Sequence, residues 1–261
     1  MVHILDETKI QDNYTKFRKL INQTFNGDRL DALNKMYDVL EDKIILTPAS
    51  SIAHFHNAFA GGYIDHVLRV TRNAVRMFDL YLEAGMDTSD YDRETVIFVA
   101  IHHDLGKVGD GETNWYIPND SQWHIENQGK IYNTNADMHW MNTNDRTNYL
   151  LQHFGIKLSE VEYLSIRLTD GLYDKGNKPY LCATAEGNAL KTNLPLLMQS
   201  ADLMSARYER ERYNTSKKTK STTKNVGGRP TKKQKLKNVK MPEKLDFKSI
   251  FGDNATGGSP S

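Results

Sequence analysis

Two histidines and two aspartates lie in segments that are otherwise apolar. His66 lies in YIDHVLRV, His103 and Asp104 end the apolar run VIFVAIHHD, and Asp202 lies in PLLMQSADLMSA. Burying a lone carboxylate is costly, so an inward-facing Asp is normally paired or bound to a metal ion. Two carboxylates and two neutral imidazoles cancel the charge of one divalent cation and leave room for waters in an octahedral shell. The four residues therefore predict a site for a hard to borderline divalent metal.

Helical periodicity, which dominates up to about residue 213, predicts that the elements positioning these residues are α-helices. Residues 63–83 are apolar on more than one face, which indicates a central helix enclosed by neighbours, and residues 94–104 indicate a second buried helix. Ser159 and Glu162 form a capping box, and Pro195 suits the first turn of a final helix to about Tyr213. Two amphipathic helices are expected near the N-terminus, with apolar residues at Ile10, Tyr14, Phe17, Leu20, Ile21, Leu30, Leu33, Met36 and Leu40.

An exception to the helical pattern lies at roughly 108–140, where Gly, Pro and Asn interrupt the sequence. Short aromatic segments at 115–117 and 130–132 are expected to pair as a small hairpin. The fold class predicted from the residues is thus all-α, with a small irregular or hairpin insertion.

Composition excludes several classes of protein. The chain has 261 residues, of which 38% are hydrophobic, enough to bury a proper core. A single cysteine allows no internal disulfide, and no run reaches the roughly 18–20 apolar residues that a membrane span needs. The N-terminal stretch MVHILDETKIQDNY carries charge where a signal peptide would be apolar. We therefore expect a cytoplasmic protein with no membrane contact.

The net charge of +1 conceals an uneven distribution. Residues 216–261 carry 12 Lys or Arg against 3 Asp or Glu, a net charge of +9, which leaves −8 for residues 1–215. The stretch 215–244 is almost free of apolar residues and is predicted to be a disordered basic linker. It is either a tether for nucleic acid or a solvated spacer. Apolar residues return within 245–261, where we expect a short docking motif or a helix that packs on the body.

The order of His66, then His103 and Asp104 in AIHHDLGK, then Asp202 in SADLMSA resembles the H…HD…D signature of the HD-domain metal-dependent phosphohydrolases. The resemblance covers roughly residues 50–210. The segment FHNAFAGGYIDHVLRV is particularly similar to the HD domain of bacterial 3′-to-5′ exoribonucleases, which carry an OB-fold that is not evident here. The chain also resembles HD hydrolases that act on free nucleotides. The resemblance therefore predicts the type of domain but does not identify the substrate.

This resemblance implies a helical bundle around a metal site, at residues 49–214 after N-terminal helices at 1–48. It implies hydrolysis of a phosphoester or phosphoanhydride bond, with His66, His103, Asp104 and Asp202 as ligands. Mn²⁺ or Mg²⁺ is the expected cofactor, and Co²⁺, Ni²⁺, Zn²⁺ and Fe²⁺ are alternatives. Lys107 is expected to hold a substrate phosphate beside the catalytic Asp104, and Asp110 to orient water or assist a second cation.

Some members of the family bind a second metal through further histidines before the last Asp. Where two histidines would precede a glycine, this chain has Thr169 and Asp170. We expect one metal, and a second held by His139 and Asp170 is the open alternative. His56 and Arg167 are candidates for substrate contacts, with a purely structural histidine as the alternative at position 56.

Two functions from different classes follow. One is a phosphohydrolase that acts on a nucleotide or on a nucleic-acid end. The other is a non-catalytic, metal-stabilised scaffold whose basic tail binds nucleic acid or a replication partner such as a sliding clamp.

Overall fold

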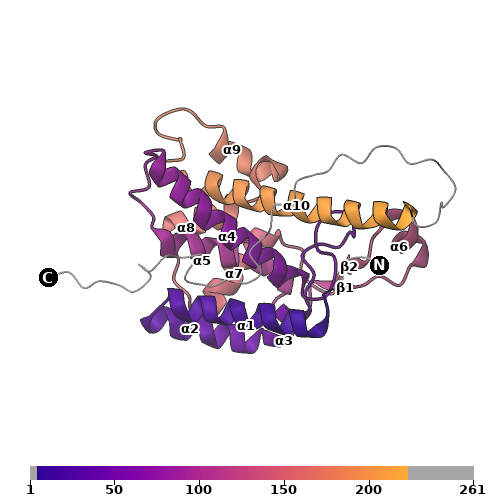
Figure 1. Cartoon of the computed structure of the whole chain (residues 1–261). Coiled ribbons are helices and arrows are strands. Elements are labelled where there is room, and N and C mark those ends of the chain that lie inside the picture. The colour runs from indigo at the N-terminus through magenta and orange to yellow at the C-terminus, as the bar shows by residue number, and fades with distance from the viewer. Residues whose placement is uncertain (1–4, 223–261) are drawn as a thin grey trace.

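The computed structural model describes residues 5–222 and confirms the all-α fold (Figure 1). Its helices are α1 (Glu7–Thr24), α2 (Gly27–Val39), α3 (Glu41–Leu46), α4 (Gly62–Glu83), α5 (Arg93–His102), α6 (Gln122–Gln128), α7 (Thr143–His153), α8 (Glu160–Leu168), α9 (Lys178–Leu181) and α10 (Leu194–Thr222). Short 3₁₀ turns span Leu105–Val108, Gly171–Tyr173 and Lys175–Asn177. The two short strands are β1 (Tyr116–Pro118) and β2 (Tyr132–Thr134).

Helix α4 is the central element, as its apolar residues on several faces predicted. It packs against α5 and α10 and also contacts α1 and α3. Tyr63, Ile64, Val67 and Val70 are fully buried along it. Figure 1 shows α10 beside α4, with α1, α2 and α3 on the opposite side of the molecule. A helix enclosed in this way can carry a polar side chain into the interior at a fixed position.

The N-terminal helices share the core of the rest of the chain. Phe17 of α1 and Tyr37 of α2 are fully buried and belong to the same cluster as Tyr63 and Phe98. The rings of Phe17 and Tyr37 meet edge to face with centroids 5.0 Å apart. The expected division between residues 48 and 49 is therefore not a break in the hydrophobic core.

Helix α5 ends where the candidate metal ligands begin. His103 caps the helix, and Asp104 precedes the 3₁₀ turn Leu105–Val108. The backbone N–H of Gly106 donates to Thr147 Oγ1 of α7 at 2.8 Å. A Cβ at Gly106 would lie 2.1 Å from the carbonyl oxygen of Thr143, so only glycine allows α7 to approach this closely. The close packing of α7 fixes the turn that follows the ligands.

The insertion at 108–140 contains the predicted hairpin, shifted by one or two residues. Strands β1 and β2 are antiparallel, with Ile117 opposite Asn133. Between them lies α6, a helix that was not predicted from the sequence. Ser121 caps it, and no residue of the helix is buried. Helical periodicity is a signal of burial, so a short exposed helix lacks it. The N–H of Ile131 donates to the carbonyl of Ser51 at 2.9 Å, which ties the insertion to the segment before α4.

Helices α8 and α10 begin at the predicted capping signals, but α10 is longer than predicted. Ser159 and Glu162 form both hydrogen bonds of the capping box, and Pro195 lies in the first turn of α10. Helix α10 continues to Thr222, past the predicted end at Tyr213. Helix α10 therefore includes residues 215–222, the first part of the stretch predicted to be a linker. The rest of the linker and the motif at 245–261 lie outside the described residues.

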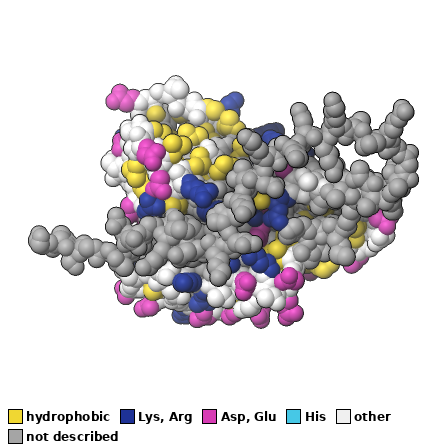
Figure 2. All heavy atoms as spheres, viewed as in Figure 1, with side chains coloured by type: hydrophobic (Ala, Val, Ile, Leu, Met, Phe, Trp, Pro, Cys, Tyr) yellow, Lys and Arg dark blue, Asp and Glu magenta, His cyan; other side chains and the backbone are white. Residues whose placement is uncertain are grey.

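The part of the chain that the structure describes has no helix both long and apolar enough to cross a membrane. Asp and Glu side chains line the lower edge of Figure 2, over α1, α2 and α3. This acidic edge agrees with the net charge of −8 calculated for residues 1–215.

The start of α4 provides a test of this packing. A Cβ at Gly62 would lie 2.0 Å from the backbone carbonyl oxygen of Asn57, whereas at Gly187 it would meet nothing within 4 Å. We expect Gly62→Ala to lower the free energy of unfolding by about 1–3 kcal/mol in urea titrations, because backbone must move. The matched control Gly187→Ala should change it by less than about 0.5 kcal/mol. Equal stability of the two variants would contradict the packing described here.

Candidate metal centre

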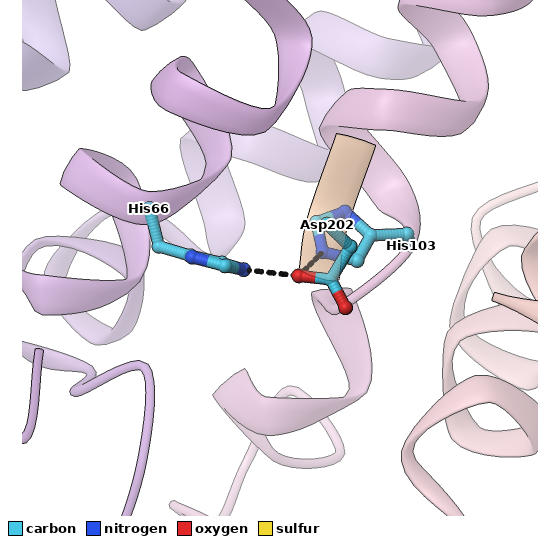
Figure 3. Close-up of side chains that lie close together, drawn as sticks. All are labelled: His66, His103 and Asp202. Carbon is cyan, nitrogen blue, oxygen red and sulfur yellow. Dashed lines mark ion pairs between the residues drawn. The ribbon is translucent and has the colours of Figure 1, made fainter. Parts of the chain in front are cut away.

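Three elements far apart in the sequence bring candidate ligands together. Helix α4 contributes His66, the end of α5 contributes His103, and α10 contributes Asp202. Each offers one ligand atom, and these atoms all lie within 4.8 Å of one another. Figure 3 shows both imidazoles facing the Asp202 carboxylate, whose Oδ1 is 3.0 Å from His66 Nε2 and 3.8 Å from His103 Nε2. This group can hold a metal ion.

Asp104, the fourth predicted ligand, lies beside this group. Its Oδ2 is 3.6 Å from His66 Nε2 and 3.5 Å from His103 Nε2. The same oxygen accepts a hydrogen bond from Lys107 Nζ at 2.5 Å. The structure thus brings all four predicted ligands together, with the Asp104 carboxylate already paired to a lysine.

The hydrogen bonds of the two histidines fix which ring nitrogen faces the centre. His66 Nδ1 is 3.2 Å from both carboxylate oxygens of Glu209, and His103 Nδ1 is 2.8 Å from the carbonyl oxygen of Ala100. Carboxylate and carbonyl oxygens only accept hydrogen bonds, so Nδ1 carries the proton in each ring. When the ring is neutral, the lone pair of Nε2 then faces the centre. A histidine that donates through one nitrogen and binds through the other is the usual metal ligand.

Of the two inward nitrogens, His103 Nε2 has no hydrogen-bond partner among the described residues. His66 Nε2 has the Asp202 carboxylate as its neighbour, 3.0 Å away. Buried polar atoms without partners are rare because desolvating them costs free energy. A divalent cation would satisfy both nitrogens and the carboxylate at once. The donor set therefore fits a metal ion.

The charges around the centre keep its carboxylates ionised. Although burial opposes it, Lys107 holds the pKa of Asp104 below its ordinary value. Burial also opposes the ionisation of Asp202, but its contact with His66 lowers its pKa. Burial alone would lower the pKa of His66, but Glu209 and Asp202 raise it to about 10. Binding of a cation at neutral pH therefore requires His66 to lose a proton.

His56 and Lys107, which were predicted to contact the substrate, also lie at the centre. The rings of His56 and His66 are tilted with centroids 5.0 Å apart. Burial, and then the nearby Lys107 charge, lower the pKa of His56 to about 3. The imidazole of His56 is therefore neutral at physiological pH and can both donate and accept a hydrogen bond.

Asp110 and Arg167 have structural partners instead. Asp110 Oδ1 accepts from the backbone N–H groups of Glu112 and Thr113, at 3.0 and 2.7 Å, and so closes a turn. Arg167 bonds Asp145, Asp174 and Asn177 at 3.0, 2.9 and 2.6 Å. These bonds stabilise the chain around the end of α8. The roles of Asp110 in orienting water and of Arg167 in contacting substrate stay predictions.

The residues considered for a second metal do not join the group of ligands. Asp170 is exposed and accepts from Asn144 Nδ2 at 3.1 Å. His139 is exposed as well, and its carbonyl oxygen accepts from Arg146 at 2.8 Å. In the region covered by residues 5–222, the ligand group of His66, His103 and Asp202 is the one found. A second metal held by His139 and Asp170 therefore stays a prediction.

Glu209 contacts a candidate ligand directly but was not predicted from the sequence. Glu209 lies in RYERERY, where four of the other residues are also charged, so its residue type did not indicate an inward position. The available signal was its spacing, because position 209 falls two helical turns after Asp202 and four residues after the buried Ser205.

Comparison with known proteins found no matching family model, no matching curated protein and no matching solved structure. The assignment of this centre therefore depends on the geometry of the chain itself.

The metal centre can be tested by calorimetric titration with Mn²⁺. We expect one ion per chain, and we expect His103→Ala to weaken binding by at least about 100-fold, because it removes a ligand. His139→Ala is the matched control and should leave stoichiometry and affinity unchanged. Loss of a second bound ion in His139→Ala would contradict a single centre.

Proposed function

We propose that the protein is a divalent-metal-dependent phosphohydrolase that cleaves a phosphoester or phosphoanhydride bond of a nucleotide or of a nucleic-acid end. The observation that carries the proposal is the convergence of two buried imidazole nitrogens with the carboxylates of Asp202 and Asp104. The order of these residues and its resemblance to the HD-domain signature support the reaction class. The fold alone carries no such conclusion.

In this proposal His66, His103 and Asp202, together with the neighbouring Asp104, would hold the cation. When bound, a divalent cation supplies Lewis-acid activation of water and of the phosphoryl group. Two imidazoles among the donors favour Mn²⁺ over Mg²⁺, which prefers oxygen ligands and retained waters.

Lys107 and His56 act on the substrate. Although burial opposes it, Asp104 raises the pKa of Lys107, so the ammonium stays charged. A fixed positive charge beside the reacting group stabilises the negative charge that develops on a phosphoryl group. The neutral imidazole of His56 orients the substrate by hydrogen bonding. Both groups are held by the protein before substrate binds, so little reorganisation is needed.

The wider setting of the enzyme follows from its composition. A single cysteine suits a reducing compartment, and we place the protein in the cytoplasm. The basic stretch after α10 suits contact with nucleic acid, and the apolar residues within 245–261 suit a partner such as a sliding clamp. Both of these contacts involve residues that the structure does not describe.

Product release from a panel of substrates tests the proposal. The panel contains ribo- and deoxynucleoside mono- and triphosphates, cyclic nucleotides, and short single-stranded RNA and DNA, each with Mn²⁺, Mg²⁺, Co²⁺ or Ni²⁺. We expect turnover of one class that is lost in Asp104→Ala, because this residue adjoins the metal. Asp137→Ala, which changes an exposed aspartate, should retain it.

Two results would count against an enzyme. Turnover that survives complete chelation would place the chemistry elsewhere. If a folded, metal-loaded protein released no product from any substrate of the panel, the non-catalytic scaffold would be favoured.

A further inference from the structure

Glu209 is a fully buried carboxylate that contacts a candidate metal ligand. It lies on α10, the helix that also carries Asp202, and its side chain has no exposed surface. Both of its oxygens lie 3.2 Å from His66 Nδ1. A buried carboxylate is strongly unfavourable unless its charge and its lone pairs are satisfied, so the partners of Glu209 must be identified.

Arg69 on α4 is the second partner of Glu209. Its Nε donates to Glu209 Oε1 at 3.0 Å, and its Nη2 donates to Asp65 Oδ2 at 2.9 Å. The guanidinium also lies 4.7 Å from the centroid of the Tyr208 ring. Arg69 is thus held at three points, and it holds the Glu209 carboxylate against His66 in turn.

Asp65 connects this chain of contacts to other parts of the fold. Its Oδ2 accepts from Asn57 Nδ2 at 3.0 Å, and its Oδ1 accepts from Asn13 Nδ2 at 3.4 Å. Asn13 lies on α1, and Asn57 lies in the segment before α4. The orientation of the His66 ring therefore depends on contacts from α1, α4 and α10. We call Glu209, Arg69 and Asp65 the carboxylate network.

The charges of the network match those of the centre. Asp104, Asp202 and Lys107 together carry −1, because the lysine cancels one carboxylate. Glu209, Arg69 and Asp65 also carry −1. With both histidines neutral, these six residues carry −2, which favours the binding of a divalent cation. Removing the charge of Glu209 would weaken that attraction.

We infer that the carboxylate network is a positioning device, in which Glu209 fixes the His66 ring for metal binding and adds negative charge near the centre. The inference rests on the proposed metal centre and adds the residues that determine its affinity. Groups that hydrogen-bond to a ligating histidine typically change metal affinity by about 10–100-fold. The competing explanation is that Glu209 and His66 form an ion pair that stabilises the fold alone.

Glu162 provides a matched control. Its side chain is 4% exposed, and it pairs with Arg29 Nη2 at 2.5 Å. It lies on α8, where its carboxylate bonds Arg29 and the backbone N–H of Ser159 and no candidate ligand. Glu162→Gln and Glu209→Gln each remove a buried carboxylate charge beside an arginine at nearly constant size. Only Glu209→Gln changes a bond to a candidate ligand.

The test is the dissociation constant of Mn²⁺ for the full chain, measured by calorimetry. We expect Glu209→Gln to weaken Mn²⁺ binding about 10–100-fold. Glu162→Gln should stay within about 3-fold of the unaltered chain. The absorption bands of bound Co²⁺ should shift in Glu209→Gln alone, because they report the ligand field. Thermal unfolding of the metal-free proteins measures the structural cost separately.

A second variant covers the case in which Glu209→Gln does not fold. Asp65→Asn removes the same unit of charge at the outer end of the network, where the side chain is partly exposed. We expect it to weaken Mn²⁺ binding several-fold. Unchanged affinity in the folded network variants, with normal binding by the unaltered chain, would overturn this inference alone. Absence of Mn²⁺ binding by the unaltered chain would overturn the metal centre as well.

Discussion

Charged groups inside a helical core are the constraint on which the rest of this structure depends. Asp104, Asp202 and Glu209 all have largely buried carboxylates, and such groups are tolerated only beside opposite charge or a cation. Arg69 and Lys107 provide part of that charge from the same helix and turn that carry His66 and Asp104. The negative charge that they do not cancel is concentrated between the Nε2 atoms of His66 and His103. The requirement to bury these groups together explains why α4, the end of α5 and α10 must meet there.

Hydrophobic packing holds the three elements at that meeting point. Helix α4 is enclosed by neighbours, so His66 projects into the interior from a fixed backbone. At Gly62 and Gly106 the backbone of other segments approaches closely, and these contacts fix the start of α4 and the turn after His103. Preorganised ligands lose little freedom when they bind, which favours both affinity and catalysis. The packing of the apolar core therefore fixes the positions of the side chains in the polar centre.

The sequence predicted the parts of the structure in which residue type conflicts with its surroundings. His66, His103, Asp104 and Asp202 stood out as polar residues in apolar segments, and the structure brings them together. Glu209 was missed because it lies among other charged residues, so its residue type does not distinguish it from side chains that face solvent. Asp110 and Arg167 were assigned chemical roles from their types, but their partners are backbone amides and nearby carboxylates that only the folded chain reveals. Helix α6 was missed because it is exposed and has no apolar stripe.

The central claim is that two imidazole nitrogens bind one divalent cation, and electron spin echo spectroscopy of the Mn²⁺-loaded chain measures this directly. The modulation pattern counts the nitrogen atoms bound to manganese. The account predicts two bound imidazole nitrogens in the unaltered chain and one when His66 is replaced by alanine at saturating Mn²⁺. A bound manganese ion without imidazole modulation would contradict it, because the ion would then occupy some other site.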